Sequence, residues 1–511
     1  MENKYYLTDK NYSYREFKPL FKGPIVVSLH SDCKKNIKKS NDRLKIAMAK
    51  DKILYGINTG FGELCSLKIK YKDLNQLQIN LVRSHASGIG DPMSAGLVRA
   101  ILFLKILTYI KGFSGIRYEI IDILIKFLNN DIIPFVPKKG SVGASGDLAP
   151  LAHIALTLIG EGYVFIDGKK IKTSVALKKL NIIPIELKPK EGLSLINGTQ
   201  VSTALAIKSL INAELILNMA DISAALSIEN SFSSKEVFES AIHQLKKHPG
   251  QRIVAKNICK LLEGSEIVAS HINCDRVQDP YSFRCVPHVH GASRDCFNNV
   301  SKIIDNEINS VSDNPLVFEN GHIANSGHFH AEHVAQNLDF LSISVSEIGS
   351  ISERRVHCMM KGINDDIQAF ISKQPGLESG YMIAHVTAAA LASENRTLAH
   401  PASVDNITTS GGQEDFVSMA PWAAEKLLKI QDNVFNILSI ELLVSGAANN
   451  LVLSKYKPSN ALDPLIKYLK KICNYNSGDR SLNNEIISIY NDLKSGTIYN
   501  FINKIVNLEL T

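Results

Sequence analysis

Several features that mark other protein classes are missing from this 511-residue sequence. No uninterrupted run of about 18 apolar residues occurs, so we expect no membrane-spanning helix. The most apolar stretch, Val434–Leu453, is interrupted by Asn436 and Glu441. The start of the chain is polar and charged, unlike a secretory signal peptide. The eight cysteines form no C-x-x-C pair, which favours reduced thiols in a cytoplasmic protein.

Strong charge is also missing. The chain carries 57 basic and 50 acidic residues, and the net charge of +7 is spread along its length. One local run of lysines has helical spacing and comprises Lys34, Lys35, Lys38 and Lys39. No stacked-aromatic RNA-binding motif accompanies this run, so a solvated helix face is favoured over a nucleic-acid site. There is no H-E-x-x-H motif, and His328 and His330 do not have the spacing of helical metal ligands, so we expect no metal.

Glycine and proline are unevenly distributed and divide the chain into two regions. In residues 1–198 they recur often, so we expect short elements joined by loops, two of which are Gly56–Gly62 and Ser87–Pro92. The segment Gly162–Lys170 indicates a β-hairpin with Asp167-Gly168 as its turn. Residues 199–511 form the second region of what we expect to be one continuous structural unit.

Three long stretches of the second region favour amphipathic helices. Thr199–His248 contains no glycine or proline, and its apolar residues recur near a period of 3.6, which predicts one long helix or two. The other stretches run from Phe329 toward Met360 and from Trp422 to Ser445. The sequence therefore predicts a mainly α fold, a bundle of long helices with a smaller mixed N-terminal region. Because helices of this length need burial on several sides, an oligomer is favoured.

The most informative segment is Gly140–His153, which has the sequence G-S-V-G-A-S-G-D-L-A-P-L-A-H. Its small residues allow the backbone to fold back on itself. In a tight turn the amide nitrogen of Gly146 can attack the carbonyl carbon of Ala144 and close a five-membered ring. Loss of two waters, one of which takes the hydroxyl oxygen of Ser145, leaves an exposed methylene on an imidazolone. Such a group is a strong electrophile.

Glycine-rich turns more often bind phosphate or simply reverse the chain. The spacing G-x-x-G-x-x-G differs from the dinucleotide and P-loop motifs, and Pro134 and Pro137 leave no clean strand ahead of it. Asp147 or Ser145 could instead cap a helix that begins near Leu148. A phosphate-binding loop and a plain helix cap therefore stay open as alternatives.

This segment and several distant motifs resemble the aromatic amino acid ammonia-lyases and aminomutases, over about Tyr55 to Leu443. In that family the same ring is the self-processed cofactor 4-methylideneimidazol-5-one (MIO). The resemblance implies that MIO forms from Ala144-Ser145-Gly146, with no metal and no nucleotide, and that the partner is a small-molecule amino acid substrate, with no nucleic acid and no membrane. It also implies a mainly helical homotetramer whose active sites each combine residues from three subunits.

Two aromatic residues match positions near the electrophile in this family. Tyr55, in Y-G-I-N-T-G-F-G, matches the base of the histidine ammonia-lyases. A phenol has a pKa near 10, so removal of a proton at pH 7 requires that pKa to fall by about three units. Phe329, in G-H-F-H-A-E, matches a phenylalanine stacked near the electrophile. Taken alone, each residue would be interpreted as ordinary core.

A carboxylate-binding motif follows later in the chain. Arg284 lies in V-Q-D-P-Y-S-F-R-C, and a guanidinium can bind a carboxylate through two parallel hydrogen bonds. The resemblance implies that Arg284 anchors the substrate carboxylate, and that Gln278 and Tyr281 line the site, with Tyr281 among the catalytic residues. Asn197, in L-I-N-G-T-Q, matches an asparagine that supports the substrate or the cofactor ring, although it could also cap the following helix.

His85 and Glu414 bear on the identity of the substrate. His85 in R-S-H-A-S-G and Glu414 in G-G-Q-E-D-F resemble the histidine ammonia-lyases, whereas phenylalanine and tyrosine lyases carry glutamine at the second position. A carboxylate can accept a hydrogen bond from an imidazole and favours its cationic form. The resemblance therefore implies conversion of L-histidine to trans-urocanate and ammonia, the first step of histidine degradation.

Three alternatives to this function remain. A tyrosine ammonia-lyase or a tyrosine 2,3-aminomutase would use the same MIO, and a catalytically silent relative would act as a binding or scaffold protein. Glu414 and Asp415 could also simply favour a helix N-terminus. The chain departs from the histidine-lyase pattern at four positions, which bear on specificity: His288, His328, Gly412 and Phe416.

Overall fold

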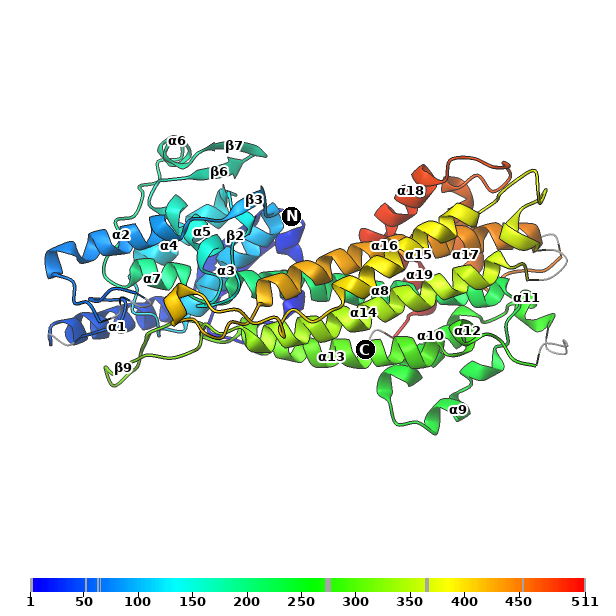
Figure 1. Ribbon diagram of the computed structural model, residues 1–511, viewed down its shortest axis with the longest axis horizontal. Helices are drawn as coiled ribbons and strands as arrows, with labels where there is room; N and C mark the ends of the chain where they lie inside the picture. The colour runs from blue at the N-terminus through cyan, green and yellow to red at the C-terminus, as the bar shows by residue number, and fades with distance from the viewer. Residues whose placement is uncertain are drawn as a thin grey trace. The chain divides into compact units, whose positions relative to one another are not determined.

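The structure is a computed structural model that describes residues 3–50, 53–61, 64, 66–271, 277–363, 367–452 and 455–509. The fold is mainly helical, as the sequence predicts, with 60% helix and 8% strand. The chain forms two compact units (Figure 1). The first comprises Met1–Lys208, Ser301–Leu338 and Pro401–Glu425, and the second comprises Ser209–Val300, Asp339–His400 and Lys426–Thr511. The division into residues 1–198 and 199–511, which the sequence suggests, stays a prediction.

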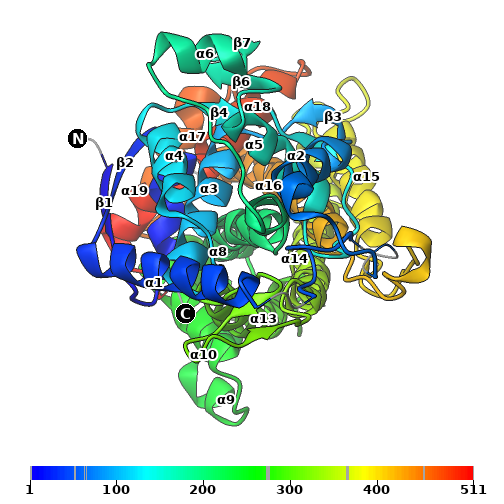
Figure 2. The ribbon, with the colours of Figure 1, turned by 90° about the vertical axis from the view of Figure 1, so that its left-hand side faces the viewer.

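The first unit contains helices α1 to α5, which are longer than the short elements expected there, whereas its α6 and α7 are short. These helices are α1 (Ser31–Met48), α2 (Leu74–His85), α3 (Ala95–Ile110), α4 (Tyr118–Asn129), α5 (Leu148–Leu158), α6 (Thr173–Lys179) and α7 (Glu191–Ile196). Helix α3 lies beside α4 (Figure 2), and all of its residues from Gly96 to Ile110 are buried. The lysine run of α1 is exposed, as predicted. Helix α3 therefore forms the centre of this unit.

The strands of the first unit are short. Parallel β1 (Asn3–Leu7) and β2 (Ile25–Leu29) pair from Asn3↔Ile25 to Leu7↔Leu29. The antiparallel pairs are β3 (Ile89–Pro92) with β5 (Pro137–Lys139), β4 (Ile133–Pro134) with β6 (Tyr163–Ile166), β6 with β7 (Lys169–Lys172), and β8 (Leu316–Val317) with β9 (Ile323–Ala324).

Two predictions about these strands have different outcomes. The hairpin at Gly162–Lys170 is confirmed, and its turn residues Asp167 and Gly168 both have positive φ, of 50° and 74°. The prediction of a loop at Ser87–Pro92 is wrong for its last four residues, because Ile89–Pro92 forms β3 through pairing with β5, which lies far along the sequence. Gly62, at the end of the other expected loop, lies outside the described residues.

Four long helices contribute residues to both units: α8 (Gln200–Asn230), α13 (Val286–Ile308), α14 (Glu332–Met360) and α16 (Ala420–Val452). Within the second unit they run side by side (Figure 1), joined by buried hydrogen bonds such as Ser227 to Ser445 and Ser352 to Glu441. Three of the four are predicted from the period of their apolar residues. The second helix considered for Thr199–His248 is not long, because the chain turns after Asn230 at Phe232, where φ is +54°.

The remaining helices of the second unit are shorter. They are α9 (Ser240–Gln244), α10 (Pro249–Leu261), α11 (Glu266–Ala269), α12 (Tyr281–Arg284), α15 (Met382–Leu398), α17 (Leu462–Ile472), α18 (Asn483–Lys494) and α19 (Thr497–Val506). Short 3-10 turns occur at Tyr14–Phe21, Tyr71–Asp73, Glu236–Phe238, Ala369–Ile371 and Ser410–Gly412. Six cysteines in the described part of the chain are unpaired thiols, whereas Cys65 and Cys274 lie outside it.

Helices α8 and α16 are long and apolar enough to cross a membrane by length and composition. In each, however, 83% of the apolar window is buried inside the structure. Core helices of proteins that never enter a membrane have the same character, so length and composition alone do not make these helices membrane spans.

Candidate active site

The Ala144–Gly146 loop lies between β5 and α5 in the first unit. Gly146 has φ of +76°, and a Cβ at this position would lie 2.2 Å from the carbonyl oxygen of Gly198. The two glycines form a parallel β-bridge, and the amide of Asp147 donates to the same carbonyl at 2.8 Å. Only glycine fits here, because any side chain would meet backbone atoms that cannot move independently.

Asp147 connects this loop to a helix that begins far along the chain. Its side chain is fully buried, and Oδ2 accepts hydrogen bonds from the amides of Val201 and Ser202 at 2.9 and 2.8 Å and from Ser202 Oγ at 3.0 Å. Asp147 thus satisfies the first turn of α8, and its side chain makes no capping bond to α5. Burial raises the pKa of Asp147 to about 6.

Ser145 and Glu414, both predicted as site residues, are in direct contact. Ser145 Oγ donates to Glu414 Oε1 at 3.0 Å. The other carboxylate oxygen, Oε2, accepts from Thr409 Oγ1 at 2.7 Å and from Ser410 Oγ at 2.6 Å. The 3-10 turn at Ser410–Gly412 precedes Glu414, and α16 begins only at Ala420, so Glu414 does not begin a helix. Two hydroxyl groups therefore fix the carboxylate against the loop.

His85, the last residue of α2, lies close enough to Glu414 for the charge of that carboxylate to act on its pKa. Its Nδ1 lies 2.9 Å from the carbonyl oxygen of Leu81, which can only accept, so Nδ1 carries the hydrogen. In the neutral ring Nε2 is therefore the acceptor. Burial lowers the pKa of His85, and the negative charge of Glu414 partly opposes that shift. His85, Glu414 and Ser145 thus form one group in the first unit.

Asn197 follows α7 as its C-cap and is 2% exposed. Its Nδ2 donates to the carbonyl of Asn314 at 2.9 Å, while Oδ1 is buried with no partner among the described residues. It does not cap α8, since Asp147 occupies that role. A buried amide oxygen without a partner is costly, which marks this atom as one that a bound group would satisfy.

Tyr55 and Phe329 are both half-buried residues of turns in the first unit. The ring of Tyr55 packs edge-on against Phe61 with ring centroids 6.5 Å apart. The next residue, Gly56, accepts a hydrogen bond through its carbonyl from Gln78 Nε2 of α2 at 3.2 Å. The helix that carries His85 therefore also anchors the turn of Tyr55. Phe329 lies just before α14.

Gln278, Tyr281 and Arg284 lie in the second unit, where Arg284 contacts each of the other two. Arg284 Nη2 donates to Gln278 Oε1 at 2.9 Å, and Arg284 Nε donates to the carbonyl of Asp279 at 3.1 Å. The guanidinium lies over the ring of Tyr281, 4.6 Å from its centroid, as in a cation–π pair. The Tyr281 side chain is 71% exposed. These three residues form an accessible group with hydrogen-bond donors suited to an anion.

Of the four departures from the family pattern, His328, Gly412 and Phe416 lie in the first unit and His288 lies in the second. His330 stacks on Phe416 at 6.1 Å, whereas His328 is exposed. His288 is in the second unit, with its ring 5.8 Å from that of His243. Among the described residues, no group of three or more His, Cys, Asp or Glu side chains is placed to hold a metal ion.

Two residues that contact the site segments are missing from the sequence-based set. His153 Nε2 accepts a hydrogen bond from the amide of Gly88 at 3.1 Å and so links α5 to the turn after His85. Lys105 binds the carbonyl of Asn197. The signal for Lys105 is a single lysine inside the apolar run L-F-L-K-I-L, whereas nothing near His153 in the sequence indicates its partner.

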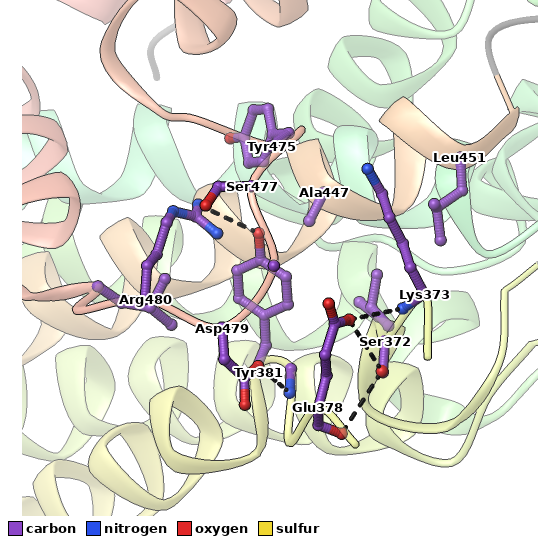
Figure 3. A pocket seen from close by; sticks show the side chains of 14 residues that line it. Ser372, Lys373, Glu378, Tyr381, Ala447, Leu451, Tyr475, Ser477, Asp479 and Arg480 are labelled. Atoms are coloured by element: carbon purple, nitrogen blue, oxygen red, sulfur yellow. Dashed lines mark hydrogen bonds between the residues drawn. The ribbon is translucent and has the colours of Figure 1, made fainter. Parts of the chain in front are cut away.

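A polar pocket in the second unit is unrelated to these residues (Figure 3). Its cavity measures about 30 Å³, and it is lined by charged side chains including Glu378, Asp479 and Arg480. Their charges are already used within the protein, since Asp479 accepts from the amides of Ser379 and Gly380. A cavity volume of this size corresponds to about two waters.

The fold and the first-unit group define a helical protein in which an Ala-Ser-Gly loop contacts a carboxylate that acts on an imidazole. The family model described as aromatic amino acid lyase matches residues 13–471. The chain therefore belongs to the aromatic amino acid lyase family.

Relatives and solved structures agree with this membership. The histidine ammonia-lyase of Burkholderia lata is 47% identical over 429 residues, which cover 84% of each chain. The crystal structure of histidine ammonia-lyase from Trypanosoma cruzi matches with a TM-score of 0.89 and 34% identity, covering 98% of this chain and 96% of that one. The tyrosine aminomutase of Streptomyces globisporus matches with a TM-score of 0.92 at 29% identity, over all of both chains.

Proposed function

We propose that this protein is an ammonia-lyase that converts L-histidine to trans-urocanate and ammonia. The observation that carries the proposal is the group formed by Ser145, Glu414 and His85, in which the Glu414 carboxylate contacts the Ala-Ser-Gly loop and its charge acts on the His85 imidazole. Relatives named histidine ammonia-lyase, at 47% identity, support the same substrate.

The residues present fit the MIO cofactor. Gly146 is held in a conformation and a space that admit no side chain, and Ser145 has a hydroxyl that can leave as water. On the adjoining turn, the buried Oδ1 of Asn197 lacks a partner that a bound ring could supply. We infer that Ala144, Ser145 and Gly146 form MIO, which supplies an electrophile for the amine of the substrate.

The imidazole of the substrate is bound by His85 and Glu414. Nε2 of neutral His85 accepts one imidazole N–H, and the Glu414 carboxylate accepts the other and favours the imidazolium. If Ser145 loses its hydroxyl as water, Glu414 Oε1 loses the partner that it has in the uncyclised chain. That oxygen then becomes the acceptor for the substrate.

The other roles concern the β-proton and the carboxylate of the substrate. Tyr55 takes the β-proton, and Phe329 packs near the reacting atoms. Arg284 binds the substrate carboxylate with two parallel hydrogen bonds, oriented by Gln278 and by the ring of Tyr281 beneath the guanidinium. Tyr281 is the remaining residue that we propose as catalytic. Each side chain thus orients or deprotonates one part of the amino acid.

We propose a cytoplasmic homotetramer whose active sites combine residues of different subunits. The exposed Tyr281, with Gln278 and Arg284 beside it, supports this assembly, because an accessible group of this kind can meet a second copy of the chain. The six unpaired thiols support a reducing compartment.

The second candidate is a tyrosine ammonia-lyase or 2,3-aminomutase that uses the same cofactor, which the likeness to tyrosine aminomutase favours. A panel of substrates separates the two. Purified protein is given L-histidine, L-tyrosine and L-phenylalanine separately, and product formation is followed by ultraviolet absorbance, with Ser145→Ala as the blank. Urocanate from histidine alone supports the proposal, and coumarate or a β-amino acid from tyrosine overturns the specificity. Absence of product from all three supports a silent binding relative.

A further inference from the structure

Lys105 is a buried lysine that the proposed reaction does not use. It lies in the middle of α3 and is only 3% exposed. An ammonium group is strongly hydrated in water, so its transfer into a protein core costs free energy unless its contacts compensate. A lysine in such a place therefore calls for a physical reason.

The contacts of Lys105 lead to the candidate site. Nζ donates to the carbonyl oxygen of Asn197 at 2.5 Å and to Gln200 Oε1 at 3.3 Å. Asn197 ends α7, and lysines commonly bind the last carbonyls of a helix. Gln200 is itself oriented by Thr108 and Ser312, which accept from its amide. Both acceptors of Lys105 are neutral oxygens.

The charges around Lys105 are balanced and buried. Lys190 and Asp313 form an ion pair of 3.0 Å at 0% and 1% exposure. Burial lowers the pKa of Lys105 to about 7, the negative charges of Asp313 and Asp147 oppose that shift, and the positive charge of Lys190 adds to it. The Tyr109 ring lies 5.4 Å from Nζ.

The carbonyl that Lys105 binds belongs to the turn that touches the loop. The residue after Asn197 is Gly198, which bridges to Gly146 and accepts from the amide of Asp147. With its carbonyl bound by Lys105 and its Nδ2 bound to Asn314, Asn197 has its unpartnered Oδ1 fixed in direction. A shift of this carbonyl would move both the bridge and that oxygen.

We propose that Lys105 is a positioning residue: its Nζ donates to the Asn197 carbonyl and thereby fixes the 197–198 turn against the Ala144–Gly146 loop. This inference rests on the proposed function, since it concerns the same site. It assigns no contact between Lys105 and the substrate.

The test compares Lys105→Met with Lys426→Met. Methionine keeps an unbranched apolar side chain as far as Cε and removes the Nζ donor. Lys426 is a matched control, since it is also 3% exposed and binds a carbonyl, that of His400, but lies in the second unit with Asp339 as its ion-pair partner. Intact mass gives the fraction of chains that have lost two waters, circular dichroism gives the folded fraction, and kinetics on L-histidine give kcat and KM.

For folded Lys105→Met we expect the cyclised fraction or kcat to fall by about ten-fold or more, with KM within about three-fold of the wild type. Lys426→Met should lose thermal stability and keep both quantities. Wild-type cyclisation and kcat in folded Lys105→Met, or equal losses in the two variants, would overturn the proposal.

Two further outcomes are decided in the same experiment. If Lys105→Met does not fold, Lys105→Arg keeps the donor and the charge: restored cyclisation supports the proposal, whereas a folded but uncyclised or an unfolded product contradicts it. If the wild-type chain itself retains both waters, the proposed function fails, and this result is distinct from any difference between variants.

Discussion

At the scale of single residues, Glu414 is the side chain whose hydrogen bonds bear most directly on the proposed reaction. Three hydroxyl groups donate to its two oxygens, and one of those hydroxyls, on Ser145, is the group that cyclisation would remove. The remaining bonds from Thr409 and Ser410 would keep the carboxylate oriented. The Glu414 carboxylate would therefore keep its orientation when the hydrogen bond from Ser145 is lost.

Replacing this carboxylate tests its role toward the imidazole. For Glu414→Gln we expect kcat/KM on L-histidine to fall by about 10- to 100-fold, because a hydrogen bond to a charged group contributes about 1.5–3 kcal/mol. The neighbouring Asp415→Asn removes the same charge from an exposed side chain and should stay close to wild type. Equal losses in both variants would assign the effect to net charge and not to a contact with the substrate.

The protonation of His85 is expected to make kcat/KM depend on pH. Burial lowers its pKa below the ordinary value of about 6.5, so the ring is neutral at and above that pH, with Nε2 as an acceptor. Below the lowered pKa, Nε2 gains a hydrogen and cannot accept. We therefore expect the ratio of kcat/KM for wild type over His85→Gln to be constant near pH 7–8 and to fall at acid pH. The ratio cancels the titration of the substrate, and a ratio that does not change with pH would contradict this role.

At the scale of elements, the Ala144–Gly146 loop depends on its contact with the 197–198 turn. Gly146 and Gly168 have nearly the same φ, +76° and +74°, but a Cβ at Gly168 meets nothing within 4 Å. Gly168→Ala should therefore lower the free energy of unfolding by about 1–2 kcal/mol, which is the cost of placing a residue with a Cβ in the left-handed conformation. Gly146→Ala adds a collision with Gly198 and should abolish cyclisation.

Thermal unfolding and intact mass of the two alanine variants check this comparison. The expected pattern is a folded, fully cyclised Gly168→Ala and an uncyclised Gly146→Ala. Normal cyclisation in Gly146→Ala would mean that the loop is free to move away from Gly198, contrary to the packing described above.

The elements that the sequence predicts well are those whose signal is local. The periods of α14 and α16 and the Asp-Gly turn of the β6–β7 hairpin need no distant partner. Helix α13 is missed because Pro287 and Gly291 interrupt its pattern, yet Gly291 is required where a Cβ would lie 2.4 Å from the Gln251 amide nitrogen of α10. Strand β3 is missed because its partner β5 is distant in the chain.

The residues of the candidate site also fall into two groups, those in local sequence motifs and those that depend on contacts between distant segments. Residues in recognisable motifs, such as Ser145, Arg284 and Glu414, can be named from the sequence. The cap of α8 by Asp147 and the contact of Lys105 with Asn197 join segments more than 50 residues apart, as their hydrogen bonds record. No local pattern encodes such pairs, so only the folded chain reveals them.

At the scale of the whole molecule, the central question is which chains supply each active site. Ser145 belongs to the first unit and Arg284 to the second. If sites combine residues of different subunits, Ser145→Ala and Arg284→Gln, each inactive alone, should regain activity when coexpressed in mixed tetramers. Equal mixtures of separately assembled tetramers serve as the control. Activity that stays absent after coexpression would place both residues in one chain's own site.

The measurement that tests the account most directly is the intact mass of the purified wild-type protein beside Ser145→Ala. The account predicts a wild-type chain lighter than its sequence by two waters, with the difference located in the peptide that carries Ala144-Ser145-Gly146, and a Ser145→Ala chain at its full mass. A wild-type chain at full mass that still forms urocanate from L-histidine would contradict it.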